Sequence, residues 1–213
     1  MKQRHACFIS FPLDVPDAEQ LAEDLYEALR ARLTLYDKQI SVFFCPRADR
    51  ERYGTGWENW IVPALCHSAM MIAICPPSYF SSSPGCTREF LAMEKLLEQR
   101  RPHMTGLVPD TPFIVGLQLI QNYSIPELNP HKVEDFSFYP METTRLARKK
   151  TSRRKVATIA DYVWKAWCEY SKPAHQEALD RARLCAQFAL EPLPARYLQT
   201  SDRFPTFGGV SGA

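Results

Sequence analysis

Short apolar segments alternate with amphipathic segments along the first half of the chain, and this alternation constrains the fold more than any other feature. The apolar segments are short, continuous and rich in β-branched and aromatic residues, which is typical of strands buried on both faces. They lie at residues 6–11 (ACFISF), 40–45 (ISVFFC), 69–75 (AMMIAIC) and 113–119 (FIVGLQL).

Between these segments, apolar residues recur with helical spacing. The spacing predicts helices over residues 17–33, over residues 57–68, and from Ser83 onward, where Ser83 is a suitable N-cap and Pro84 suits the first helical position. Strands that are joined by single helices form right-handed βαβ units and therefore a parallel sheet.

The sequence pattern predicts fewer helices and strands in the second half of the chain. Residues 136–140 (FSFYP) predict a short edge strand, and residues 151–171 predict a closing amphipathic helix. We therefore expect an α/β fold of the flavodoxin-like type, with a doubly wound, parallel, five-stranded sheet over residues 1–172. Residues 173–213 predict a C-terminal helical extension followed by a flexible tail.

Charge and cysteine content exclude several classes of protein. The chain has 26 basic and 24 acidic residues and a net charge of +2, so nothing points to nucleic acid as a partner. No apolar run approaches the roughly 20 residues that span a bilayer, and no secretory signal is evident, so we expect no membrane association. The seven cysteines are odd in number and include no C-x-x-C pair. They predict free thiols in a cytoplasmic protein, without a disulfide framework or a metal site.

Several catalytic motifs are absent from the sequence. It contains no phosphate-binding G-x-x-x-x-G-K-[ST] loop, no G-x-S-x-G nucleophile elbow and no H-E-x-x-H pair. Gly54-Thr55-Gly56 lacks the third glycine of a dinucleotide fingerprint. The third predicted strand ends in Cys75-Pro76, where a response-regulator receiver would need an aspartate.

Three predicted loops share the carboxyl edge of the sheet, which is where ligands bind in folds of this class. These loops are residues 12–16, 46–56 and 76–83. Together with their flanking residues they carry an apolar-x-Ser-aromatic strand (Phe8–Phe11), a Gly-Thr-Gly-Trp entry to a helix (Gly54–Trp57) and a serine-rich loop that leads to Cys86-Thr-Arg-Glu89. In order and spacing these segments resemble the TIR (Toll/interleukin-1 receptor) domain family in its bacterial, NAD⁺-cleaving form, over roughly residues 5–170. Gly85 stands where the family often has a tryptophan.

The resemblance implies that Glu89 is the catalytic glutamate of an NAD⁺ glycohydrolase, with NAD⁺ as substrate and no resident cofactor. Ordinary glycosidases need a second carboxyl group to protonate the leaving alkoxide. Nicotinamide leaves as a neutral pyridine, so a single carboxylate that stabilises the ribosyl cation is sufficient. Cyclisation of the ADP-ribose product is a second outcome that the residues leave open.

Six further residues are candidates for binding the substrate. Phe11 and Tyr79 offer rings that could stack on nicotinamide or adenine, and Ser10 could hydrogen-bond a ribose or phosphate. Arg47 could meet the pyrophosphate. Ser82 and Cys86 belong to the same serine-rich segment, where a packing role for Cys86 is favoured over a nucleophilic one.

Alternative interpretations remain at this stage. A glutamate near the start of a helix is stabilised by the helix dipole and needs no further role. The resemblance also fits a non-catalytic TIR–TIR interaction module that self-associates in signal transduction, with a separate sensor or effector as partner. A third alternative is a nucleotide-sensing domain that binds NAD⁺ without turnover. In the catalytic case, the resemblance implies a role in antiviral defence, innate immunity or NAD⁺ depletion.

Overall fold

We analysed a computed structural model of the chain. It describes residues 4–46, 58–103, 111–139, 146, 150–172, 193–194 and 197. All structural statements below refer to these residues.

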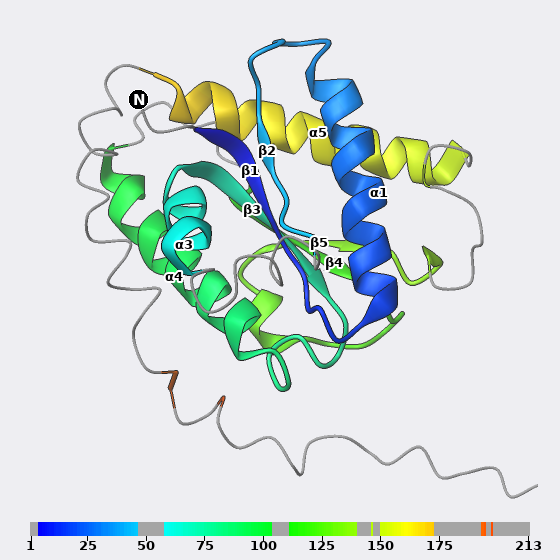
Figure 1. The fold of residues 1–213 in the computed structure, drawn as a ribbon. Helices are drawn as coiled ribbons and strands as arrows, with labels where there is room; N and C mark the ends of the chain where they lie inside the picture. The colour runs from blue at the N-terminus through cyan, green and yellow to red at the C-terminus, as the bar shows by residue number, and fades with distance from the viewer. Residues whose placement is uncertain are drawn as a thin grey trace, which may run out of the picture.

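The sheet has five parallel strands in the order β2-β1-β3-β4-β5 (Figure 1). The strands are β1 (His5–Ser10), β2 (Val42–Phe43), β3 (Ser68–Cys75), β4 (Ile114–Gln118) and β5 (Lys132–Asp135). This order and direction confirm the predicted doubly wound, flavodoxin-like α/β fold.

Helices cover both faces of the sheet. The helices α1 (Pro16–Leu33) and α5 (Lys150–Tyr170) pack together on one face, and α3 (Glu58–Cys66) and α4 (Pro84–Arg100) pack together on the other (Figure 1). Two short 3-10 helices lie at Arg101–His103 and Pro126–Leu128. The predicted helix over residues 174–190 lies outside the described residues.

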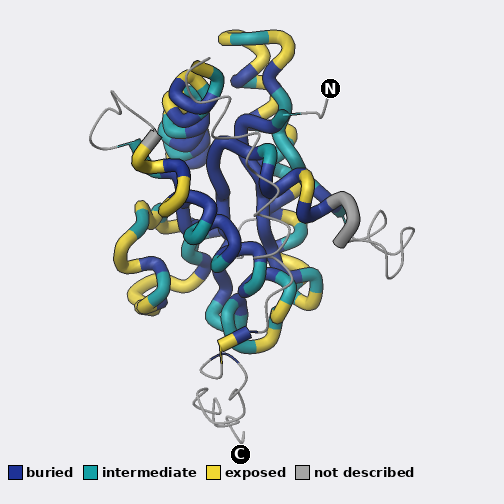
Figure 2. Tube along the Cα trace, turned by 90° about the vertical axis from the view of Figure 1, so that its left-hand side faces the viewer, coloured by how far each residue is buried: buried dark blue, intermediate teal, exposed yellow. Residues whose placement is uncertain are grey.

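The core lies around β1 and β3. Every residue of both strands is buried, as Figure 2 shows for the centre of the molecule. The helix α1 contributes one apolar face, with Leu21, Leu25 and Leu29 fully buried against the sheet. Because the central strands meet helices on both faces, their continuous apolar sequence is what the fold requires.

The predicted fifth strand at residues 136–140 is wrong, because β5 lies just before it, at Lys132–Asp135. Phe136 still donates its N–H to the carbonyl of Gln118 (2.7 Å), but the chain then turns, as Tyr139 N–H bonds back to the carbonyl of Phe136. β5 is an edge strand with exposed, charged side chains, so it has none of the apolar character that marks a central strand. Of the aromatic residues that suggested a strand, Phe136 and Tyr139 are instead buried in the turn after it, and Phe138 is partly buried there.

Two other predicted elements differ in extent. The second strand was expected over residues 40–45, but only Val42–Phe43 pairs regularly with β1. The helix expected over residues 57–68 is α3, with Pro63 inside it. The prediction of free thiols is wrong at Cys66, which is disulfide-bonded. It is confirmed for five other cysteines, Cys7, Cys45, Cys75, Cys86 and Cys168.

Arg100 holds the end of α4 against the segment that joins α3 to β3. Its buried guanidinium donates to the carbonyls of Ser68 (2.7 Å) and Cys66 (2.6 Å) and lies over the Tyr170 ring at 4.9 Å. Burial lowers the pKa of Arg100 to about 10. These contacts hold α4 against the start of β3 and thereby fix which residues the other end of the helix presents to the sheet.

Candidate functional site

The strand order places a topological switch point between β1 and β3. From β1 the chain continues to β2 on one side, and from β3 it continues to β4 on the other. The loops that leave these two strands therefore diverge, and the crevice between them is the usual ligand site of a doubly wound sheet. The loop after β1 and the loop after β3 were both predicted to lie at this edge.

Three buried polar side chains meet at this switch point. The Ser10 hydroxyl, at the end of β1, donates to Glu89 Oε2 at 2.5 Å and lies 2.7 Å from the Tyr79 hydroxyl. Ser10 and Tyr79 are fully buried, and Glu89 is 3% exposed. Because the Ser10 proton is donated to the carboxylate, its oxygen is left to accept the proton of Tyr79. We call these three residues the switch-point cluster.

The start of α4 sets the position of Glu89. Ser83 is the N-cap and Pro84 the first helical residue, as predicted, although no side-chain cap hydrogen bond forms. Glu89 follows Pro84 by five residues, which places it in the second turn, and the first turn contains no acidic residue. The effect of the helix dipole falls off within the first turn, so it contributes little at Glu89.

The two loops are joined by hydrogen bonds at the surface. Asp14, in the loop after β1, accepts hydrogen bonds from Ser82 (3.3 Å) and Ser83 (3.2 Å) in the loop after β3. Ser82 also bonds to the carbonyl of Ser78 within its own loop. These contacts bring the two loops together above the switch-point cluster, and they place Ser82 at the exposed rim and not beside Glu89.

Tyr79 lies in an environment that keeps its hydroxyl protonated. Burial raises the pKa of Tyr79 well above its ordinary value, and the neighbouring Cys86, Cys75 and Glu89 raise it further, while the hydrogen bond with Ser10 lowers it. The phenol is therefore a neutral hydrogen-bond donor at ordinary pH.

Other predicted binding residues lie in different surroundings. Phe11 is fully buried and its ring stacks on Phe44, with centroids 5.5 Å apart. Cys86 is buried as a free thiol, which accords with a packing role. Arg47 lies outside the described residues. The structure thus brings Ser10, Tyr79 and Glu89 into direct contact, whereas Phe11 and Tyr79 have no exposed ring face.

Sequence reasoning missed an aromatic cluster beside the site. The ring of Phe80 packs edge-on against the rings of Tyr79 and Phe90, with centroid distances of 4.8 and 5.0 Å. Tyr79 belongs to the switch-point cluster, and Phe90 follows Glu89 in the sequence. Tyr197, from the region predicted to be a tail, is also buried, with its ring 6.1 Å from that of Phe80. Only the aromatic residues next to Ser78 and Glu89 in the sequence could have signalled part of this cluster, since Tyr197 lies more than 100 residues away.

The fold and the switch-point cluster define an α/β domain with a buried carboxylate at the carboxyl edge of a parallel sheet. No protein-family model, curated protein or solved structure matches the chain. In the described segments, no helix has both the length and the apolar character needed to cross a membrane. The same segments contain no group of three or more His, Cys, Asp or Glu side chains that could hold a metal ion.

Proposed function

We propose that this protein is a TIR-like NAD⁺ glycohydrolase in which Glu89 is the catalytic carboxylate. The observation that carries the proposal is the Ser10–Glu89 hydrogen bond at the carboxyl end of β1, next to the switch point. A carboxylate at this point has a defined orientation, lies at the usual ligand edge of the fold, and is buried, so its interaction with a cation is stronger than it would be in water.

In the proposed reaction, the bond between ribose C1′ and the nicotinamide nitrogen breaks and both electrons go to the nitrogen. Nicotinamide leaves as a neutral molecule, and positive charge develops on the ribose. Glu89 stabilises this charge, after which water adds to C1′ and loses a proton to give ADP-ribose. Capture by the adenine of the same molecule would give the cyclic product instead.

Ser10 and Tyr79 act in this proposal as positioning residues. Hydrogen bonds to a charged acceptor are shorter and stronger than neutral ones, so the Ser10 hydroxyl holds the carboxylate in one orientation. Since Glu89 is 3% exposed, NAD⁺ reaches it only when the residues that cover it move. Self-association is one way to stabilise such an open form, in keeping with the family resemblance.

The decisive experiment is an NAD⁺ consumption assay on the full chain, at dilute protein and under crowding. Glu89→Gln removes the charge but keeps a carbonyl acceptor for Ser10. We expect it to abolish NAD⁺ loss, as would be typical for removal of a transition-state charge. The matched control is Glu98→Gln, the same change at an exposed position of α4, which should leave the rate unchanged. If the wild-type protein consumes no NAD⁺ at any concentration, the catalytic proposal is wrong and a non-catalytic interaction module replaces it.

A further inference from the structure

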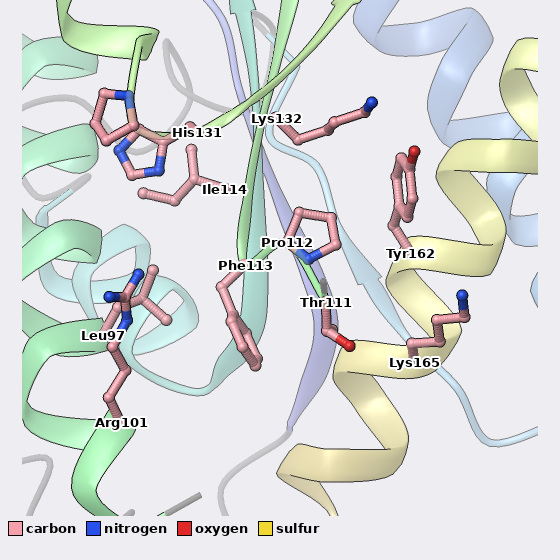
Figure 3. A pocket seen from close by; sticks show the side chains of 11 residues that line it. Leu97, Arg101, Thr111, Pro112, Phe113, Ile114, His131, Lys132, Tyr162 and Lys165 are labelled. Atoms are coloured by element: carbon pink, nitrogen blue, oxygen red, sulfur yellow. The ribbon is translucent and has the colours of Figure 1, made fainter. Parts of the chain in front are cut away.

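A second candidate site lies at the opposite edge of the sheet from the switch-point cluster. A cavity of about 590 Å³ opens where β4 and β5 begin, between the end of α4 and the second half of α5 (Figure 3). Its lining includes Ile114 and Lys132, the first residues of β4 and β5. Ser10 is the last residue of β1, so in this parallel sheet the two sites face opposite edges. The volume falls within the range of small-molecule and cofactor sites.

The charged residues that line this cavity are all basic. Arg101, Lys132 and Lys165 line it together with His131, and no Asp or Glu is among the lining residues. Figure 3 shows that the cations come from two sides, with Arg101 and His131 near α4, and Lys132 and Lys165 near α5. A hollow whose charged lining residues are all basic has a positive potential, which attracts an anionic ligand.

Nearby carboxylates neutralise only part of this charge. Glu94 bonds His131 Nε2 at 3.0 Å, and Glu134 lies 3.9 Å from the Lys132 ammonium. Arg101 and Lys165 form no ion pair with any described residue. These two side chains are therefore the ones available to bind an anion, and guanidinium and ammonium groups are the usual ligands of phosphate.

The floor of the cavity is suited to a ring. Phe113 and Pro112 lie between the two charged sides, and Tyr162 extends along the α5 side (Figure 3).

We propose that this cavity binds a small phosphate ester that carries a flat ring, of the size of a mononucleotide. The phosphate binds Arg101 on the α4 side, the ring packs on Phe113 and Tyr162, and Lys165 adds positive charge from the α5 side. The site is separate from the switch-point cluster and does not depend on the NAD⁺ glycohydrolase proposal.

The test is calorimetric titration of the full-length protein with adenosine 5′-monophosphate as the probe, with adenosine and inorganic phosphate as partial ligands. We expect saturable binding of the monophosphate that is at least about tenfold tighter than that of either partial ligand, because each lacks one half of the recognition. If inorganic phosphate binds as tightly as the monophosphate, the proposed packing of the ring is wrong. The absence of saturable monophosphate binding up to millimolar concentration would overturn all of it.

Charge-reversal variants assign the binding to this cavity. Arg101→Glu and Lys165→Glu change exposed side chains, so both proteins should fold, and each should weaken monophosphate binding by about tenfold or more. The matched control is Arg154→Glu, an exposed cation on the same helix about three turns away, which should change the affinity less than twofold. Binding that is lost in Glu89→Gln but kept in Lys165→Glu would locate the ligand at the switch point and refute the cavity.

Discussion

Replacing Ser10 by alanine tests whether the switch-point cluster is a coupled network. The substitution removes the 2.5 Å hydrogen bond to Glu89 and also the Ser10 hydroxyl that bonds to the fully buried Tyr79 hydroxyl. A hydrogen bond to a charged group contributes about 1.5–3 kcal/mol, and a buried hydroxyl left without a partner costs about 1–3 kcal/mol. Because water and side-chain relaxation offset part of the sum, we expect Ser10→Ala to lower the free energy of unfolding by about 2–4 kcal/mol.

The same loss appears in the melting temperature. A chain of this length loses about 2–4 °C in Tm for each kcal/mol, so the expected decrease is roughly 5–15 °C. Urea unfolding, followed by circular dichroism, gives the free energy directly, and an unchanged m value shows that the denatured state is not altered.

The second step is Tyr79→Phe in both backgrounds. In the wild-type protein it removes a satisfied hydroxyl and should cost about 1 kcal/mol. In Ser10→Ala it removes a buried hydroxyl that has lost its partner, so it should raise the stability by about 1 kcal/mol or more. This inversion of sign is the signature of the coupling. If Tyr79→Phe destabilises both proteins equally, the two hydroxyls act independently and the network interpretation is refuted.

Two further predictions concern stability elsewhere in the fold. Burial, reinforced by His67, lowers the pKa of His5 to about 4, so the unfolded chain, with a histidine pKa near 6.5, binds more protons between these two values. Stability should therefore fall as the pH is lowered from about 6.5 to 4, and urea midpoints of His5→Gln should fall less over that window; an equal fall would contradict the assignment. At Gly116, a Cβ atom would lie 2.6 Å from Leu128 Cδ1 in the core. Gly116→Ala should cost about 1–3 kcal/mol, and Leu128→Ala in that background should recover part of the loss, whereas a neutral Gly116→Ala would show that Leu128 repacks freely.

The elements that were predicted well are those whose sequence is determined by burial on both faces. β1 and β3 are buried on both faces and apolar except at their ends, so their identity and the parallel topology follow from the pattern of short runs and helices. β5 was missed because an edge strand is exposed and charged, and the only signal nearby came from Phe136 and Phe138, which pack after the strand ends. Element boundaries at the sheet edges depend on such tertiary packing and not on local pattern.

The candidate site was predicted in part. Ser10, Tyr79 and Glu89 were all selected, but Tyr79 was expected to present a ring face, whereas its hydroxyl provides the contact with Ser10. Tyr79 and Glu89 lie 69 and 79 positions from Ser10 in the sequence, so their hydrogen bonds with Ser10 become visible only once the loops are placed in space. The basic cavity had no sequence signal at all, since its cations come from separate segments and are ordinary surface residues in each.

The burial of Glu89 argues that the residue is present for a reason other than packing. The site lies in a core where apolar side chains would pack without penalty, and burying a carboxylate costs free energy that the hydrogen bond from the neutral Ser10 hydroxyl offsets only partly. The helix dipole gives little compensation, because Glu89 lies beyond the first turn of α4. A cationic ligand would interact favourably with this carboxylate, and the more charge it develops during reaction, the more the preorganised carboxylate contributes. The ribosyl cation formed from NAD⁺ has that property, and a permanently neutral ligand does not.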